Sequence, residues 1–149
     1  MSKMTEALTQ AAVLTFEELA FLLPDQDLNA KQKAAGNEAR VTVPFEGPFQ
    51  GSLVVRLYGG VLPSLTANML GETTRPDERT QQDALGELAN VICGNALPSI
   101  AGSKEVFRLG APQVERFRGS PWSKSQGAAS AHISLGLEEG RAEVDLHIH

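Results

Sequence analysis

The strongest constraint on the fold is the alternation of apolar and polar residues near the C-terminal end of the sequence. Apolar residues occupy every second position from Ala131 to Leu137, and the same alternation resumes from Ala142 to Ile148. Glu138, Glu139 and Gly140 between the two segments are typical of a turn. A period of two buries one side of each strand and leaves the other side in water. It therefore predicts an antiparallel sheet with a single covered face.

A second pair of alternating segments lies in the first half of the chain. Residues 39–45 and 52–58 alternate in the same way, and Glu46-Gly47-Pro48 between them predicts a hairpin. Because Pro44 cannot donate a hydrogen bond to a neighbouring strand, we expect its strand to lie at a sheet edge or to carry a bulge. Two shorter strands are predicted at 106–109 and 114–117.

Apolar residues at helical spacing predict three helices. They span residues 5–23, 61–70 and about 76–97. Pro24 and Gly71 mark the ends of the first two, and Pro98 is expected to interrupt the third. Residues 25–37 are polar and irregular and are expected to form a connection. Together these elements predict an α+β fold, with helices packed on one face of an antiparallel sheet, in a single domain over residues 1–149.

Composition excludes several classes of function. The net charge is −5 and the 13 lysines and arginines are scattered, so we expect no nucleic-acid partner. No apolar run approaches the roughly 20 residues that span a bilayer, and the N-terminus does not resemble a signal peptide. We therefore expect a cytoplasmic protein with no membrane association. Cys93 is the only cysteine, which rules out an intramolecular disulfide and a cysteine-based metal site.

The predicted long helix carries an unusual polar stripe. At about 100° per residue, five residues fall on one side: Asp83, Gly86, Glu87, Asn90 and Gly94. The stripe has no basic residue to offset its acids, and each glycine costs helix stability of about 1 kcal/mol. Glycines at these positions would leave the carboxylate and amide side chains standing clear for another macromolecule. We therefore expect this helix to insert its polar side chains into the pocket of a partner.

Other polar residues have simpler interpretations. Asn95 lies on the apolar side of the helix and is expected to be a hydrogen-bonded core amide. Cys93 has no neighbouring base and is expected to be a half-buried structural thiol. His147 and His149 could share a metal, but exposed side chains at a chain end are favoured, and no metal site is predicted. Trp122, in the loop predicted at 118–127, fits either a partner contact or a cover over the core.

A second copy of the stripe is suggested by a short internal similarity. Glu18-Leu19-Ala20-Phe21 in the first helix parallels Glu87-Leu88-Ala89-Asn90 in the long helix. Both chance and an old duplication are compatible with three identities. Because Phe21 stands where the long helix has Asn90, we expect only the long helix to carry a functional site.

The motif Asp83-x-x-x-Glu87-x-x-Asn90, followed by Pro112, resembles the signature of the CheC and CheX phosphatases of bacterial chemotaxis. The Gly94-Asn95-Ala96 segment and the presence of one motif rather than two resemble the CheX branch. The spacing to Pro112 is one residue shorter than the family pattern, and the 118–127 loop departs from it.

The resemblance implies a hydrolase that removes the aspartyl phosphate from a CheY-type response-regulator receiver. It also implies that Asn90 positions the attacking water and Glu87 anchors a receiver lysine, while Asp83, Gly86 and Gly94 contact the partner. The chain itself would need no cofactor, because Mg²⁺ would belong to the receiver, and a homodimer joined through strands is expected.

Two other functions remain open from the sequence. The first is a non-catalytic module of the same fold that binds a receiver or another signalling protein. The second is a structural domain that dimerises through an exposed sheet edge, with Glu87 and Asn90 buried or covered by a partner subunit. The sequence does not identify the receiver, and two-component pathways other than chemotaxis are compatible with it.

Overall fold

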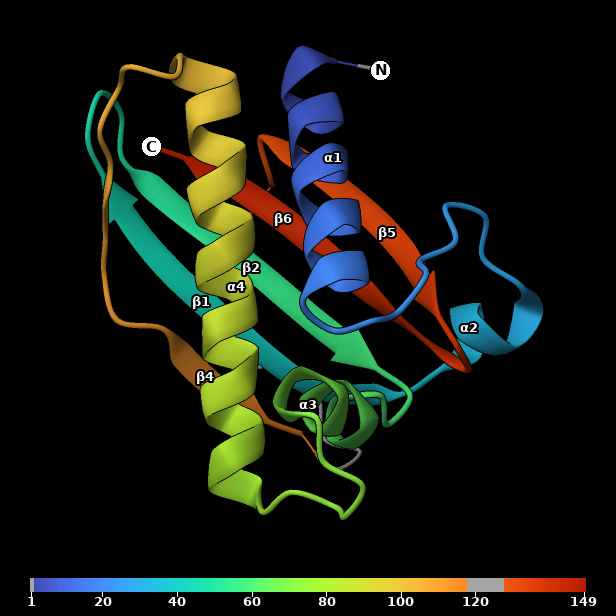
Figure 1. Cartoon of the computed structure of the whole chain (residues 1–149). Helices are drawn as coiled ribbons and strands as arrows, with labels where there is room; N and C mark the ends of the chain where they lie inside the picture. The colour runs from blue at the N-terminus through green and yellow to red at the C-terminus, as the bar shows by residue number, and fades with distance from the viewer. Residues whose placement is uncertain (1, 118–127) are drawn as a thin grey trace.

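The computed structural model describes residues 2–117 and 128–149, and the strands in this part of the chain form one antiparallel sheet (Figure 1). They span Asn37–Glu46 (β1), Gly51–Tyr58 (β2), Arg108–Leu109 (β3), Gln113–Arg116 (β4), Ala131–Leu137 (β5) and Gly140–Ile148 (β6). The order across the sheet is β3–β1–β2–β6–β5, and β4 also pairs with β1. Both predicted hairpins are present, β1–β2 and β5–β6, and they join where β2 pairs with β6.

A layer of helices covers one face of this sheet, as predicted. The helices are α1 (Lys3–Glu18), α2 (Ala30–Ala34), α3 (Leu62–Leu70) and α4 (Glu78–Ala101). Figure 1 shows α1 and α4 side by side across the sheet, running in opposite directions, with α3 below them. The short α2 lies beside the β5–β6 turn, where the Gln32 amide donates to the Glu138 carbonyl at 2.9 Å. This is the α+β architecture expected from the sequence.

The core fills the space between the helix layer and the sheet. Alternate residues of each long strand point into it and are fully buried: Val41, Val43, Val55, Leu57, Val144 and Leu146. The helices contribute Leu8 and Phe16 from α1 and Leu85, Leu88 and Ile92 from α4. Burying a side chain of this size contributes about 1.5–3 kcal/mol. A shift of one residue in any long strand would move its buried set into water, so this face fixes the register.

A buried carboxylate ties the sheet to α3. Glu38 of β1 is 7% exposed and accepts hydrogen bonds from the backbone N–H groups of Val61 and Leu62, at 2.7 and 2.9 Å. N–H groups at the start of a helix have no partner within the helix, and that end favours negative charge. At the other end, Gly71 closes α3 with a left-handed φ of 66°, as predicted.

Two predicted helix ends were wrong. The first helix ends at Glu18 rather than near Leu23, because Phe21 adopts a φ of 55° and the chain turns Leu22 into the core. The long helix continues past Pro98 to Ala101. Pro98 has no N–H for the carbonyl of Gly94, but Gly94 is exposed, so water can satisfy that oxygen.

We expected the strand that contains Pro44 to lie at a sheet edge or to carry a bulge. The expectation of an edge was wrong. β1 is paired with β2 on one side and with both β3 and β4 on the other. The partners on that second side separate at Pro44, where no N–H is available, and the Gly110 N–H donates to the Pro44 carbonyl at 2.7 Å.

The connection predicted at 25–37 also contains structure. It includes α2, which is closed by a reciprocal capping box between Asn29 and Gln32. Across the described ranges, the helices are either too short or too polar to cross a bilayer.

Candidate active site

The polar stripe lies along α4 in a mixture of exposed and covered positions. Asp83, Glu87 and Gly94 are exposed, Asn90 is half-buried and Gly86 is buried. The helix begins with Asp77 as its N-cap, whose side chain accepts from the Thr80 N–H at 2.8 Å. Hydrogen bonding by the Thr80 side chain, and then by its backbone N–H, lowers the pKa of Asp77 below its usual value. The stripe therefore sits on a helix that is capped at its start and held against the sheet along its apolar side.

Gly86 is buried because Pro112 packs against it. A Cβ atom added to Gly86 would lie 3.3 Å from the Cβ of Pro112, closer than ordinary van der Waals contact. Residue 86 therefore lets the chain before β4 approach the helix, and a shallow hollow of about 240 Å³ forms beside Asp83 and Pro112. Gly94 differs from Gly86, because a Cβ atom there would meet nothing within 4 Å. Only the second of the two glycines leaves open space above the helix.

The side chain of Asn90 is the most unusual group of the stripe. Its Oδ1 atom is buried and accepts no hydrogen bond from the described part of the chain. A buried acceptor without a donor costs about 1–3 kcal/mol, and such groups are rare in native structures. The rest of Asn90 reaches the surface one turn after Glu87. Among the described residues, Oδ1 therefore lacks a donor, while the rest of the amide side chain is the part that a partner can reach.

Glu87 is an exposed carboxylate with no ion pair among the described residues. The nearest basic residue along the sequence of α4 is Arg79, two turns earlier. An unpaired carboxylate on a helix free of nearby cations is available to a cation of a partner. The interpretation as a structural domain predicts that Glu87 and Asn90 are buried or covered by a partner subunit; within one chain Glu87 is exposed and Asn90 is half-buried.

Asn95 and Cys93, which adjoin the stripe in the sequence, differ in their exposure to solvent. Asn95 is exposed, so the prediction of a buried core amide was wrong; it lies at the margin between α4 and α1 rather than beneath α4. Cys93 is fully buried, and burial raises the pKa of its thiol to about 12. A thiol that keeps its proton is a poor nucleophile, in agreement with a structural role.

The C-terminal histidines do not behave alike. His149 is exposed, but His147 is only 6% exposed, so the prediction that both are exposed was wrong for His147. His147 lies opposite Ser52 in the β2–β6 pairing, where neighbouring strands limit its access to water. No group of three or more His, Cys, Asp or Glu residues within the described ranges could hold a metal ion. Trp122 and the loop predicted at 118–127 lie outside the described residues.

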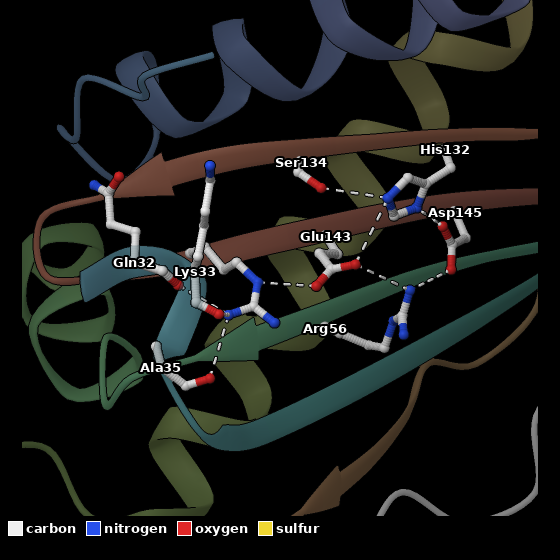
Figure 2. A network of polar contacts seen from close by, with 9 residues as sticks. Gln32, Lys33, Ala35, Arg56, His132, Ser134, Glu143 and Asp145 are labelled. Carbon is white, nitrogen blue, oxygen red and sulfur yellow. Dashed lines mark hydrogen bonds and ion pairs between the residues drawn. The ribbon is translucent and has the colours of Figure 1, made fainter. Parts of the chain in front are cut away.

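The face of the sheet opposite α1 and α4 carries a polar network that the sequence analysis did not identify (Figure 2). Arg56 bridges Asp145 at 2.7 Å and Glu143 at 3.6 Å, and Arg141 contacts Glu143 at 2.9 Å. His132 hydrogen-bonds Asp145 through Nδ1. The alternation of charged residues along β6 was the signal for this network. Arg56 of β2 pairs with Asp145 of β6, so this network consists of ion pairs between neighbouring strands.

The chain shares its fold with chemotaxis proteins of known structure. The chain superposes on the chemotaxis protein CheX of Vibrio vulnificus with a TM-score of 0.78 at 19% identity, covering 99% of this chain and 97% of that one. For CheX of Desulfovibrio desulfuricans the TM-score is 0.79 at 18% identity, with coverages of 99% and 100%. These TM-scores establish a shared fold.

A third solved structure contains a partner protein. It is the CheX–CheY–BeF3–Mg+2 complex from Borrelia burgdorferi, with a TM-score of 0.71 at 20% identity and coverages of 97% and 96%. Comparison with curated protein sequences gives no match.

The family model described as chemotaxis phosphatase CheX matches residues 40–135, and the chain therefore belongs to the CheX family. The matched segment contains α4 with Glu87 and Asn90, and it contains Pro112.

Proposed function

We propose that this protein hydrolyses the aspartyl phosphate of a CheY-type receiver by inserting the exposed side of α4 into the receiver's phosphorylation pocket. The observation that carries the proposal is the presence of Asn90 and Glu87 one turn apart on α4. Among the described residues, the Oδ1 atom of Asn90 is buried without a hydrogen-bond donor, and the exposed carboxylate of Glu87 has no cation beside it. Membership of the CheX family supports phosphatase chemistry, and the Borrelia complex supports a CheY-type partner.

Asn90 is the proposed positioning group for the attacking water. Hydrolysis of an acyl phosphate proceeds through a loose transition state, so alignment of the water matters more than its deprotonation. A neutral amide can accept from the water and donate to it without placing negative charge beside the phosphoryl group. A carboxylate at this position would repel that group. The missing donor for Oδ1 would then be the water itself.

Glu87 is the proposed anchor. Its carboxylate would pair with a lysine of the receiver and hold α4 over the pocket. Asp83, Gly86 and Gly94 are proposed to contact the receiver on either side of this pair; Gly86 would act through Pro112, which covers it. The Mg²⁺ ion bound by the receiver would offset phosphoryl charge, and the chain contributes no ligand to it.

The proposal is tested by phosphate release from a CheY-type receiver phosphorylated with acetyl phosphate. We expect Asn90→Ala to reduce the rate of release roughly 100-fold, as misplacement of a reacting group does. Glu87→Ala should instead raise KM about tenfold, the effect of losing about 1.4 kcal/mol of binding. Gln50→Ala, which removes an exposed amide in the β1–β2 turn, is the matched control and should change neither.

Two results would contradict the proposal. The first is an unchanged rate for Asn90→Ala with a receiver that the wild type dephosphorylates. The second is wild-type protein that binds the phosphorylated receiver and releases no phosphate, which would indicate a non-catalytic binding module.

A further inference from the structure

An apolar groove runs between the outer sides of α1 and α4. It has a volume of about 270 Å³ and is lined by Leu14, Thr15, Glu18 and Leu19 from α1 and by Val91 and Asn95 from α4. Leu14 is 48% exposed, an unusual position for a large apolar side chain halfway along a helix packed on the core. Exposed apolar surface rimmed by polar residues is typical of an interaction site.

The groove is continuous with the polar stripe. Val91 follows Glu87 by four residues, and Asn95 follows Val91 by four, so the three form one row on the surface of α4. Gly94 lies beside this row, with open space above it. A partner that contacts Glu87 and Asn90 would therefore also cover the α4 side of the groove.

The two helices that form the groove each carry a net negative charge. α1 has three acidic residues and a single basic residue, Lys3, and α4 has three acidic residues and a single basic residue, Arg79. Each basic residue stands in the first turn of its helix, and because the helices are antiparallel, the two lie at opposite ends of the pair (Figure 1). Glu18 borders the groove at the C-terminal end of α1, and neither helix places a lysine or arginine beside it. Such a surface favours a partner with a basic rim.

We propose that this groove is the second contact point for the receiver, and that it takes an apolar side chain flanked by basic residues next to the receiver's phosphorylation pocket. The inference rests on the proposed function and adds the chemistry of the surface that the substrate must present. An apolar anchor in a pocket surrounded by complementary charge is the usual arrangement of the residues that dominate binding. The stripe would supply the chemistry, and the groove would select the receiver.

Two variants test the groove while leaving α4 unchanged. Leu14→Asp replaces the apolar wall with a charge, and Glu18→Lys reverses the charge at the rim. We expect each to raise KM for the phosphorylated receiver, and Kd for its BeF3–Mg²⁺ adduct, about tenfold. The value of kcat should not change, because neither residue reaches the phosphoryl group. Val106→Asp is the control: Val106 is 82% exposed and lies between α4 and β3, outside the groove.

The outcomes separate this inference from the proposed function. If wild-type protein is active, Asn90→Ala is inactive and Leu14→Asp retains wild-type KM and Kd, the groove inference is wrong and the catalytic proposal stands. If Asn90→Ala is as active as the wild type, the catalytic proposal is wrong. If Val106→Asp raises KM as much as Leu14→Asp, an added negative charge anywhere is the cause, and the groove inference is overturned. Thermal unfolding of each variant verifies that the fold is intact.

Discussion

At the scale of single residues, Asn90 and Cys93 differ in what burial does to them, although they are neighbours on one helix. Burial leaves the Asn90 oxygen without a donor among the described residues, while the rest of its side chain reaches the surface. Burial keeps the Cys93 thiol protonated and shields it from reagents. The first residue is thereby available for chemistry and the second is not.

Cys93 provides a test of this difference. Burial raises its pKa in the folded protein to about 12, above the ordinary value of 9.0, so the unfolded state loses the proton first as pH rises. The stabilising contribution is therefore complete below pH 9 and is lost as pH rises toward 12. At pH 8 we expect a thiol reagent such as DTNB to label native protein slowly and urea-unfolded protein fast. Equal labelling rates in the two states would contradict the assigned burial.

At the scale of elements, α4 is adapted on its two sides to different tasks. Its apolar side holds the core, and the two glycines of its polar side serve different purposes: Gly86 admits Pro112, whereas Gly94 leaves space empty. A glycine in a helix that touches nothing destabilises the helix without packing in return. Its retention at position 94 is explained if a partner occupies that space.

Gly94→Ala separates stability from function. Alanine is favoured over glycine in a helix by about 1 kcal/mol, so the free energy of unfolding in urea should rise by up to that amount. KM for the phosphorylated receiver should rise as well, because the new methyl group stands on the docking surface. Gly86→Ala is the comparison: the contact with Pro112 should cancel the gain in stability. An unchanged KM for Gly94→Ala would remove Gly94 from the docking surface.

The attachment of α3 gives a second test at this scale. Glu38→Ala removes the acceptor of two backbone N–H groups and should lower the free energy of unfolding by about 2 kcal/mol. Glu38→Gln keeps one acceptor oxygen and should cost less. Urea denaturation measures both, and equal stability of Glu38→Ala and wild type would show that these hydrogen bonds contribute nothing net.

The sequence predicted those helices and strands that show a regular pattern of apolar residues along the chain. Alternation found β1, β2, β5 and β6 and the helical period found α4, because the apolar side of each packs into the core. Features set by contacts distant in sequence were missed. β1, the strand that contains Pro44, is paired on both sides because β3 and β4 return from more than 60 residues later. α1 ends early because Leu22 is drawn into the core, and Asn95 is exposed because α1 leaves a groove there.

The candidate site divides in the same way. Glu87 and Asn90 could be chosen from helical spacing and the family resemblance. The missing donor of Asn90, the cover of Pro112 over Gly86 and the groove beside Leu14 required the packing of α4 against two other segments.

At the scale of the whole molecule, the sheet leaves one long edge. In the described part of the chain, β5 pairs with β6 on one side, and its other side carries one isolated bridge, between Asp25 and Gly136. An unpaired edge can accept another strand. Elements from both ends of the chain, α1 and β6 included, share one core, which supports the proposal of a single domain.

The family resemblance and this edge lead us to expect a homodimer joined through strands. Size-exclusion chromatography with light scattering should give about twice the chain mass of 15.9 kDa. A mass of one chain across the accessible concentration range would contradict the dimer. The result bears on assembly alone, because the stripe and groove lie on the helix layer of one chain.

The central claim is that Asn90 holds water in line with phosphorus. The most direct measurement is single-turnover decay of a phosphorylated CheY-type receiver in Mg²⁺ with this protein in saturating excess. Saturation removes any effect on binding, so the observed rate reports the chemical step alone. The account predicts that Asn90→Ala protein, although bound, leaves the phosphoryl group to decay at the receiver's intrinsic rate. Decay as fast as with wild-type protein would contradict it.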